Sequence, residues 1–376
     1  MLTTRQLSKW GIGAGVIAAC ILLWNPCANA IFSIGLALDL KKLASGAGGQ
    51  ELAVKQTRLR RSFNDKDYEA LLYSSDKSTP KTAVVLVAGL SELGCYHPRA
   101  IALSRFLADR GLLVITPDIR EFRDFQISAE PIEQILLWYK QIHGLKEGAK
   151  ANKIGIGGIS FSGTLALIAA ARPEIRDSVG FVAAIGPYSS LIRCTKGWFA
   201  AASGPARPYY PTRFYAKWIV MRAALSMIAE SEDRIFLHDV LNSLLLQKKV
   251  PSASPGLSSE AARWYALATM PEIRSDPELS VEIESYLVSR IYPQLDPVKA
   301  LREIRCPVFL AHGEYDDLIP ATESRELHQT IPGSHMLISP FLTHTHPTET
   351  PISLGRKFGA ALDAVGFFYQ FAQVVR

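Results

Sequence analysis

The sequence predicts an α/β fold, in which a mostly parallel central sheet is flanked by helices on both faces. Short runs of aliphatic and β-branched residues alternate with longer segments whose apolar residues recur at helical spacing. Several of the short runs, such as Ala83–Ala88, are apolar throughout, which is typical of parallel strands buried on both faces. The chain has 376 residues, of which 48% are hydrophobic and 20% charged, so it can form a large core.

Each expected element follows from its own pattern. Strands are predicted where apolar runs are short, and helices where apolar residues recur every three or four positions. The expected strands are Thr57–Phe63, Tyr68–Tyr73, Ala83–Ala88, Leu112–Thr116, Lys153–Ile159, Val179–Ile185, Val308–Ala311 and Met336–Leu342. The expected helices are Pro98–Arg110, Ile132–His143, Gly163–Ala171, Ala321–Thr330 and Leu354–Val375. Helices between successive strands predict crossover connections in a parallel sheet.

The alternation breaks between about Tyr188 and Asp296, where helical patterns are separated by proline-rich joints. The helical patterns there are Tyr215–Glu230, Asp233–Leu246 and Ser258–Ala268. We therefore expect a helical cap, inserted into the α/β core before the strand at Val308. The predicted division is an N-terminal segment over residues 1–42, a first part of the core over 43–187, the cap over 188–296 and a second part of the core over 297–376.

The N-terminal segment has the composition of a signal sequence or signal anchor. Arg5 and Lys9 precede an uncharged stretch over residues 10–37, which is longer than the roughly 20 residues that a membrane helix needs. We expect an uncleaved helix that anchors the protein in a membrane, with the catalytic domain outside the cytoplasm. Lysines also follow the stretch, so the orientation stays open. One alternative is a secreted protein, cleaved after Ala30 at the small-x-small sequence 28–30. The other is a buried N-terminal helix.

Charge and cysteine content limit the other classes. The formal net charge is +6, yet no dense basic stripe with interleaved aromatic residues occurs, which disfavours nucleic-acid binding. The five cysteines are scattered and form no C-x-x-C pair, so neither a disulfide scaffold nor a zinc site is indicated. They are Cys20, Cys27, Cys95, Cys194 and Cys306. A single bridge between Cys95 and Cys194 is the pairing to consider if the domain lies outside the cytoplasm.

One segment carries the chemistry. The expected strand Lys153–Ile159 runs directly into the sequence Gly158-Ile159-Ser160-Phe161-Ser162-Gly163, and a helix follows at once. Small residues two positions before and after Ser160 are needed where a strand turns sharply into a helix, because larger side chains would collide. The helix N-terminus below such a turn favours developing negative charge. Ser160 is therefore the expected nucleophile, with Ser162 as the alternative apex.

The segment resembles the Gly-x-Ser-x-Gly elbow of the α/β-hydrolase superfamily, with Ser162 where glycine is usual. The resemblance covers the chain from about residue 55 to the C-terminus, apart from the content of the cap. It implies a Ser–His–Asp triad in which the acid and then the histidine follow the serine along the chain, each just after a strand. A serine hydroxyl is a weak nucleophile unless a base, itself oriented by a carboxylate, takes its proton.

The resemblance then points to one acid and one base. The segment Pro307–Pro320 runs from an apolar strand into Asp316-Asp317 and is similar to the family's acid turn, which indicates Asp316, with Asp317 as the alternative. The last expected strand is followed by Thr343-His344-Thr345-His346, which indicates His344, with His346 as the alternative. No third ligand pattern lies near the two histidines, so no metal site is expected.

The remaining site residues are the donors of an oxyanion hole. The family places one backbone N–H after the nucleophile and one in the loop after the third strand, which implies Phe161 and Leu90. Aromatic residues of this region could line an acyl pocket, and they fit the core of the cap equally well. They are Phe161, Trp198, Phe199, Tyr209, Tyr210 and Trp218.

These residues together imply a cofactor-free serine hydrolase that cleaves carboxylic esters, with lipid-like or other apolar acyl substrates favoured by a membrane location. Thioesterase and peptidase activities use the same triad and stay open. A different class is also open, namely a membrane-tethered binding or scaffold protein that does not catalyse a reaction. Fold alone does not choose between them, because this fold carries many chemistries.

Overall fold

A computed structural model describes residues 29–37, 52–63, 65–77, 79–200, 212–253, 256–270, 276–342 and 352–376. The strands are β1 (Lys55–Phe63), β2 (Lys66–Ser74), β3 (Thr82–Val87), β4 (Leu112–Pro117), β5 (Lys153–Ile159), β6 (Val179–Ile185), β7 (Val308–Gly313) and β8 (His335–Ser339). The core helices are α2 (Pro98–Asp109), α3 (Arg120–Arg123), α4 (Glu130–Gln141), α5 (Phe161–Ala170), α11 (Val298–Leu301), α12 (Ala321–Thr330) and α13 (Leu354–Val375). Single 3₁₀ turns are η1 (Gly94–Tyr96), η2 (Ile142–Gly144), η4 (Leu225–Met227) and η5 (Tyr292–Gln294).

The strands form one eight-stranded sheet in the order β1-β2-β4-β3-β5-β6-β7-β8. The β1–β2 and β2–β4 pairs are antiparallel, and every later pair is parallel. Every residue of β3 and β4 is buried, as expected for central strands covered on both faces. This order, with a sharp turn after β5, is the α/β-hydrolase fold that the sequence predicted.

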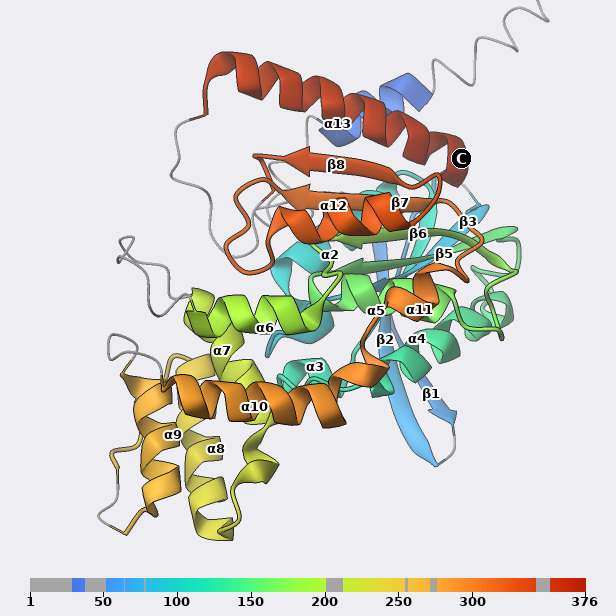
Figure 1. Cartoon of the computed structure of the whole chain (residues 1–376). Coiled ribbons are helices and arrows are strands. Elements are labelled where there is room, and N and C mark those ends of the chain that lie inside the picture. Colours follow the sequence, from blue (N-terminus) through green and yellow to red (C-terminus); the bar gives the residue numbers. More distant parts are fainter. Residues whose placement is uncertain are drawn as a thin grey trace, which may run out of the picture.

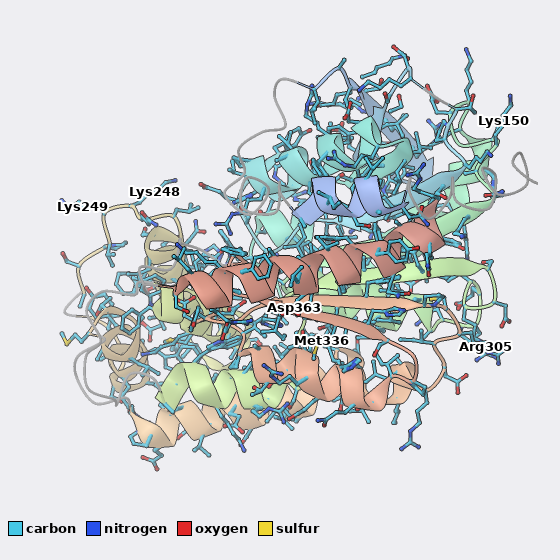
Figure 2. The ribbon with its side chains drawn as sticks, turned by 90° about the horizontal axis from the view of Figure 1, so that it is seen from above. Lys150, Lys248, Lys249, Arg305, Met336 and Asp363 are labelled. Carbon is cyan, nitrogen blue, oxygen red and sulfur yellow. The ribbon has the colours of Figure 1, made fainter. Side chains whose placement is uncertain are left out.

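Helices cover the two faces of the sheet and give it two cores (Figure 1). On one face α4, α5 and α12 pack against the strands, and this core continues into the helices that follow β6. On the other face α2, α13 and a helix over residues 29–37 pack together around Phe181 and Phe309. Figure 2 shows α13 lying across the strands with the helix over residues 29–37 beside it. The carboxyl ends of the parallel strands, where sites of this fold class form, are left open between the layers.

Between β6 and α11 the described residues form five α-helices, most of which lie at the lower left in Figure 1. They are α6 (Leu191–Ala200), α7 (Thr212–Ala223), α8 (Ser231–Leu245), α9 (Ser259–Thr269) and α10 (Pro277–Arg290). The sequence patterns predicted α7, α8 and α9 but missed α6 and α10. The start of α10 carried a readable signal, because Asp276 caps it by accepting a hydrogen bond from the Leu279 amide at 2.9 Å.

One strand prediction was wrong at its end. The expected strand Met336–Leu342 is the shorter β8, and the chain turns after Ser339. Pro340 has no N–H for a further ladder bond, and the amide of Leu342 instead donates to the Ser339 carbonyl at 3.3 Å. The turn brings Leu342 back over the end of β7, next to the loop that carries Asp316.

The N-terminal segment is described only in part. Residues 29–37 form a helix whose Phe32 and Leu36 are buried against α2 and α13, so the end of the uncharged stretch packs on the domain. Its earlier part, with Cys20 and Cys27, lies outside the described residues. Within the described part of the chain, α13 alone is long and apolar enough to cross a membrane, but it buries Ala360, Phe367 and Phe371 against the sheet.

The cysteines that the structure describes are thiols. Cys95 in η1 and Cys194 in α6 are both buried and free, so the bridge considered between them is absent. Burial, together with the neighbouring Asp118 carboxylate, raises the pKa of Cys95 to about 12. Burial also raises the pKa of Cys194. Protonated thiols of this kind are packing residues rather than nucleophiles.

Candidate functional site

Ser160 stands at the turn between β5 and α5 in a backbone conformation that non-glycine residues rarely adopt. Its φ is 62° and its ψ is −130°, and α5 begins at the next residue. The turn is held by the Ser160 amide, which donates to the Ile185 carbonyl of β6 at 2.6 Å. A side chain at Gly158 would place its Cβ 2.2 Å from the Ser162 carbonyl oxygen, so only glycine fits there. Strained residues of this kind persist where the surrounding structure enforces them, commonly at active sites.

Ser162 has a different role from Ser160. Its side chain is fully buried, and its hydroxyl oxygen accepts a hydrogen bond from the Ile159 amide at 2.8 Å. The hydroxyl itself lies 2.9 Å from the Val87 carbonyl and 2.8 Å from the Ile159 carbonyl, to which it can donate. These contacts tie β3, β5 and the turn together. A hydroxyl held in this way, in a site closed to solvent, supports Ser160 rather than Ser162 as the reactive apex.

Phe161 and Leu90, whose backbone N–H groups are expected to bind an oxyanion, line the same cleft as Ser160. Phe161 is the first residue of α5, and Leu90 follows Gly89 in the loop after β3. A Cβ at Gly89 would lie 3.5 Å from the Ser160 Cβ and 3.2 Å from the Ile159 carbonyl, so this loop runs close against the turn. Neither amide has an acceptor among the described residues. Helix N-termini leave such donors free, and both are available to a bound anion.

Asp316 lies in the loop after β7 with its carboxylate almost completely buried. Its Oδ1 accepts hydrogen bonds from the amides of Leu318 and Ile319, both at 2.9 Å. Its Oδ2 lies 3.4 Å from Nε2 of His312, and the side chain is only 3% exposed. Asp316 lines the same cavity as Ser160, whereas Asp317 does not line it. This placement supports Asp316 over the neighbouring carboxylate.

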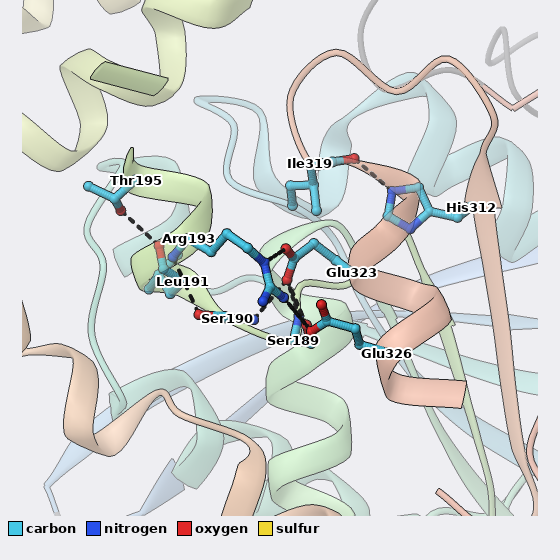
Figure 3. A network of polar contacts seen from close by, with 9 residues as sticks. All are labelled: Ser189, Ser190, Leu191, Arg193, Thr195, His312, Ile319, Glu323 and Glu326. Carbon is cyan, nitrogen blue, oxygen red and sulfur yellow. Dashed lines mark hydrogen bonds and ion pairs between the residues drawn. The ribbon is translucent and has the colours of Figure 1, made fainter. Parts of the chain in front are cut away.

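His312 at the end of β7 is a structural residue. It is fully buried, and its Nε2 lies 2.8 Å from the Ile319 carbonyl, which can only accept a hydrogen bond. Nε2 therefore carries the proton, and Nδ1 accepts from the Ser324 hydroxyl at 2.7 Å. The imidazole thus holds the acid loop against α12 (Figure 3). The other histidine near the sheet, His335, begins β8 and stacks on Phe309 with ring centroids 4.9 Å apart, at the opposite edge from Ser160.

The predicted base lies outside the described residues, as does its alternative, because the description stops at Leu342 and resumes at residue 352. The structure therefore places neither His344 nor His346. It does place the chain just before them. Leu342 lines the cavity that Ser160 and Asp316 share, and its carbonyl oxygen lies 2.5 Å from where a Cβ at Gly313 would be. Glycine at 313 lets this chain pass directly over the end of β7.

A cleft of about 620 Å³ lies between the core and the cap, with Ser160, Phe161 and Leu90 in its wall. Among the aromatic residues considered for it, Phe161, Trp198 and Trp218 line the cleft, whereas Phe199 is buried in the core. Tyr209 and Tyr210 lie outside the described residues.

Two polar residues in the wall of the cleft, His97 and Arg99, were missed by the sequence reasoning. Burial lowers the pKa of both. Their position in the sequence could have indicated them, because both stand at the start of α2, shortly after the loop that carries Leu90. Among the described residues, no three His, Cys, Asp or Glu side chains come together as a metal site.

A polar network fixes the acid side of the site to the cap (Figure 3). Glu323 at the start of α12 is 1% exposed and accepts hydrogen bonds from the Ser189 and Ser190 amides at 2.9 and 2.8 Å. Arg193 of α6 donates to the same carboxylate at 2.6 Å and also pairs with Glu326. Burial would raise the pKa of Glu323, but the bonds from Arg193, from the Ser189 hydroxyl and from these amides outweigh it and lower the pKa. Glu323 is therefore charged at neutral pH.

Comparisons with known proteins found similarity only among solved structures, since no family model and no curated protein matches this sequence. The acylaminoacyl peptidase of Pyrococcus horikoshii is 14% identical over 86% of this chain and 41% of its own, with a TM-score of 0.46. Est1E of Butyrivibrio proteoclasticus is 12% identical over 85% of this chain and 99% of its own, with a TM-score of 0.46. A bacterial brefeldin A esterase is 14% identical over 93% of this chain and 86% of its own, with a TM-score of 0.46.

The chain thus spans about two fifths of the length of the acylaminoacyl peptidase. At such identities the likeness concerns the fold, and the strand order and the turn at Ser160 carry the assignment in this chain itself. The protein has the α/β-hydrolase fold, with a helical region between β6 and β7 and Ser160 at the sharp turn after β5.

Proposed function

We propose that the protein is a serine hydrolase that cleaves carboxylic esters, with Ser160 as nucleophile, Asp316 as acid and His344 as base. The observation that carries this proposal is the backbone at Ser160. A serine is held at φ 62° on a glycine-dependent turn at the wall of a cleft, beside two backbone amides that have no acceptor among the described residues. Such strain has a cost of roughly 1–3 kcal/mol, and packing alone gives no reason to keep a serine in it.

The mechanism follows from these positions. The Ser160 hydroxyl attacks the ester carbonyl while His344 takes its proton, and the carboxylate of Asp316 orients the imidazole and stabilises its charged form. The amides of Leu90 and Phe161 stabilise the oxyanion of the tetrahedral intermediate. His344 then protonates the leaving alcohol, and an acyl-enzyme on Ser160 remains. Water attacks this acyl-enzyme with His344 as base and releases the acid.

The position of Leu342 supports a histidine shortly after it as the base. Consecutive Cα atoms are about 3.8 Å apart, so the Cα of His344 lies within about 8 Å of that of Leu342. Leu342 itself lines the cavity of Ser160 and Asp316. His346, two residues further on, has a longer tether and stays the alternative.

We also propose that the enzyme works at a membrane, held there by its N-terminal segment, with the catalytic domain outside the cytoplasm. The support is a set of exposed apolar side chains at two places on the layer formed by α13 and the helix over residues 29–37, namely on that helix and at the start of α13. Ile31 is 73% exposed, Leu354 83% and Phe358 68%. Large exposed apolar residues of this kind favour contact with a membrane or a protein. Cleavage near Ala30 and secretion would leave the same group exposed.

A fluorophosphonate probe with a short alkyl chain tests the catalytic proposal, because it reacts only with an activated serine. Purified wild-type protein should be labelled and should hydrolyse p-nitrophenyl esters. Ser160→Ala should abolish labelling and lower kcat/KM by roughly 10⁴-fold or more, while Ser162→Ala should still be labelled. His344→Ala and His346→Ala separate the two candidates for the base.

A well-folded wild type that takes no label would support the non-catalytic binding protein instead. Thioesters and acylated peptides belong in the same assay, because the triad serves them equally. A higher kcat/KM on either class than on esters would move the substrate assignment.

A further inference from the structure

A second cavity opens at Ser160, on the opposite side from the cap cleft, and we name it the α13 cavity. It has a volume of about 180 Å³ and lies between the sheet and the layer formed by α2, α13 and the helix over residues 29–37. Its floor includes Leu86, Ala183 and Ala311, and its roof includes Leu36, Leu103 and Phe368. Ser160 and Asp316 stand at one end. Figure 2 shows the two roof helices side by side over the strands.

The cavity exists because small side chains occupy the centre of the sheet. Gly157 of β5 is paired with Ala183 of β6, and Ala311 lies further along on β7. Ala183 and Ala311 are partly exposed although they belong to central strands, where side chains are normally buried. The accessible space above them is the cavity, and nothing from the roof fills it.

Aromatic rings line the end away from Ser160. Phe181 packs against Phe371 with ring centroids 5.6 Å apart, and Phe309 packs against Phe371 and Phe367 at 5.2 and 5.8 Å. A Cβ at Gly155 would lie 2.2 Å from the ring of Phe181, so that ring fills the space over the start of β5. Ser160 therefore lies at the carboxyl-end side of the cavity, and the aromatic rings line it towards the amino ends of the strands.

The lining decides what the channel can hold. Apart from Ser160, Asp316 and Arg99, the side chains that line it are hydrocarbon or aromatic. Dry apolar cavities of about 150 Å³ bind a molecule the size of benzene, so this channel has room for about six carbon atoms. The cap cleft on the other side is larger and includes the polar residues Ser91, His97 and Gln247. An ester has an acyl part and an alcohol part, and the two cavities meet at Ser160, the residue proposed to attack the carbonyl between them.

We infer that the α13 cavity binds the hydrocarbon chain of a linear acyl group of about six to eight carbons, while the alcohol part of the ester lies in the cap cleft. This inference rests on the proposed function and names its substrate class. The acyl carbonyl lies at Ser160, and the chain extends between Ala183 and Phe368 towards the Phe181 ring. The cavity favours hydrocarbon chains of limited length, because its volume is small and its walls away from Ser160, Asp316 and Arg99 are apolar.

The test is the chain-length profile of the full-length protein on p-nitrophenyl esters from acetate to dodecanoate. Wild type should prefer hexanoate or octanoate. Ala183→Leu places a larger side chain in the channel and should lower kcat/KM for octanoate by at least roughly tenfold, since each buried methylene contributes about fourfold. The loss should be larger for octanoate than for acetate, whose acyl part is too short to reach the Ala183 side chain. Ala361→Leu is the matched control, because Ala361 is exposed on the outer side of α13 and should leave the profile unchanged.

Ala311→Val is a second variant in case Ala183→Leu folds poorly, and labelling by the short fluorophosphonate reports an intact site in both. An unchanged profile in labelled Ala183→Leu and Ala311→Val would overturn the inference and leave the proposed function standing. Octyl acetate, which carries its eight-carbon chain on the alcohol side, is assayed beside the p-nitrophenyl esters. If the variants lose activity on octyl acetate alone, the channel holds the alcohol chain, which also overturns the inference and leaves the proposed function standing. A wild type that takes no label overturns the proposed function and this inference with it.

Discussion

The two sides of the candidate site are built by different means. The turn at Ser160 is shaped largely by its neighbours in sequence, through the contacts of Gly158 and Ser162, and is anchored to β3 and β6 by two hydrogen bonds. The acid loop depends on residues that are far away in sequence. Its Leu318 carbonyl accepts a hydrogen bond from Trp198 of α6 at 2.7 Å, and α12, which follows it, is tied to the Ser189–Ser190 segment through Glu323.

The difference teaches which part of the site can adjust. The turn at Ser160 is sterically tight, so a change there strains the backbone. The acid loop is held by polar contacts that cross between the core and α6, so its position is coupled to the cap. A change of the cap should therefore reach the site through Asp316 and leave the backbone of Ser160 unchanged.

The largest expected effect tests the steric contacts that shape the turn at Ser160. Gly158→Ala places a Cβ 2.2 Å from the Ser162 carbonyl, which the backbone can relieve only by opening the turn. We expect a loss of about 3 kcal/mol or more in the free energy of unfolding, measured by urea denaturation, together with lost labelling at Ser160. Gly163→Ala is the control, because its Cβ would make contacts of 3.3 Å and longer. Equal losses in the two variants would mean that the turn is not sterically special.

Glu323→Gln tests the polar contacts that tie α12 to α6 and to the Ser189–Ser190 segment. The neutral amide keeps the shape but loses the charge that Arg193 and the Ser189 and Ser190 amides bind, so we expect a loss of about 2–3 kcal/mol. The pKa of Glu323 is lower in the folded protein, so its stabilisation is present above its unfolded pKa and is lost as the pH falls through the folded pKa. Wild type should lose stability in acid and Glu323→Gln should lose less of it. Parallel curves for the two proteins would rule out the charge as the cause.

A third variant changes a residue of the cap itself, in α7, instead of the turn at Ser160 or the loop that carries Asp316. Lys217 of α7 is 1% exposed, and burial lowers its pKa to about 8. The unfolded chain binds this proton more tightly, so stability should rise with pH from about 8 to the unfolded pKa. Lys217→Met removes the cost of burying the charge and should stabilise the protein by roughly 2 kcal/mol at pH 7. The gain should shrink by pH 10, as measured by urea unfolding at both pH values. A gain that is independent of pH would point to packing instead.

The smallest expected effect returns to the nucleophile turn. Ser162→Ala leaves the Ile159 amide without its side-chain acceptor, and we expect a loss of about 1–2 kcal/mol in the free energy of unfolding. Fluorophosphonate labelling should persist, because the hydroxyl of Ser162 is buried among backbone groups. Loss of labelling with retained stability would instead make Ser162 the reactive serine.

The sequence alone was enough for the features that depend on local pattern. The strands Lys153–Ile159 and Val179–Ile185 and the helices Ala321–Thr330 and Leu354–Val375 were predicted with the bounds that the structure has. The elbow at Ser160 was readable because its steric demand falls on residues two positions away. The mostly parallel sheet was anticipated, since alternating strands and helices limit the connections that such a sheet allows, whereas the order of its strands came from the structure.

The tertiary structure decided what depends on residues distant in sequence. It distinguished Ser162, whose hydroxyl meets a carbonyl of β3, from Ser160, and it made His312 a support of the acid loop. It also opened a channel above Ala183 that no sequence pattern indicates. Spacing along a chain describes one element at a time, whereas a cavity or a buried polar contact is a property of several elements packed together.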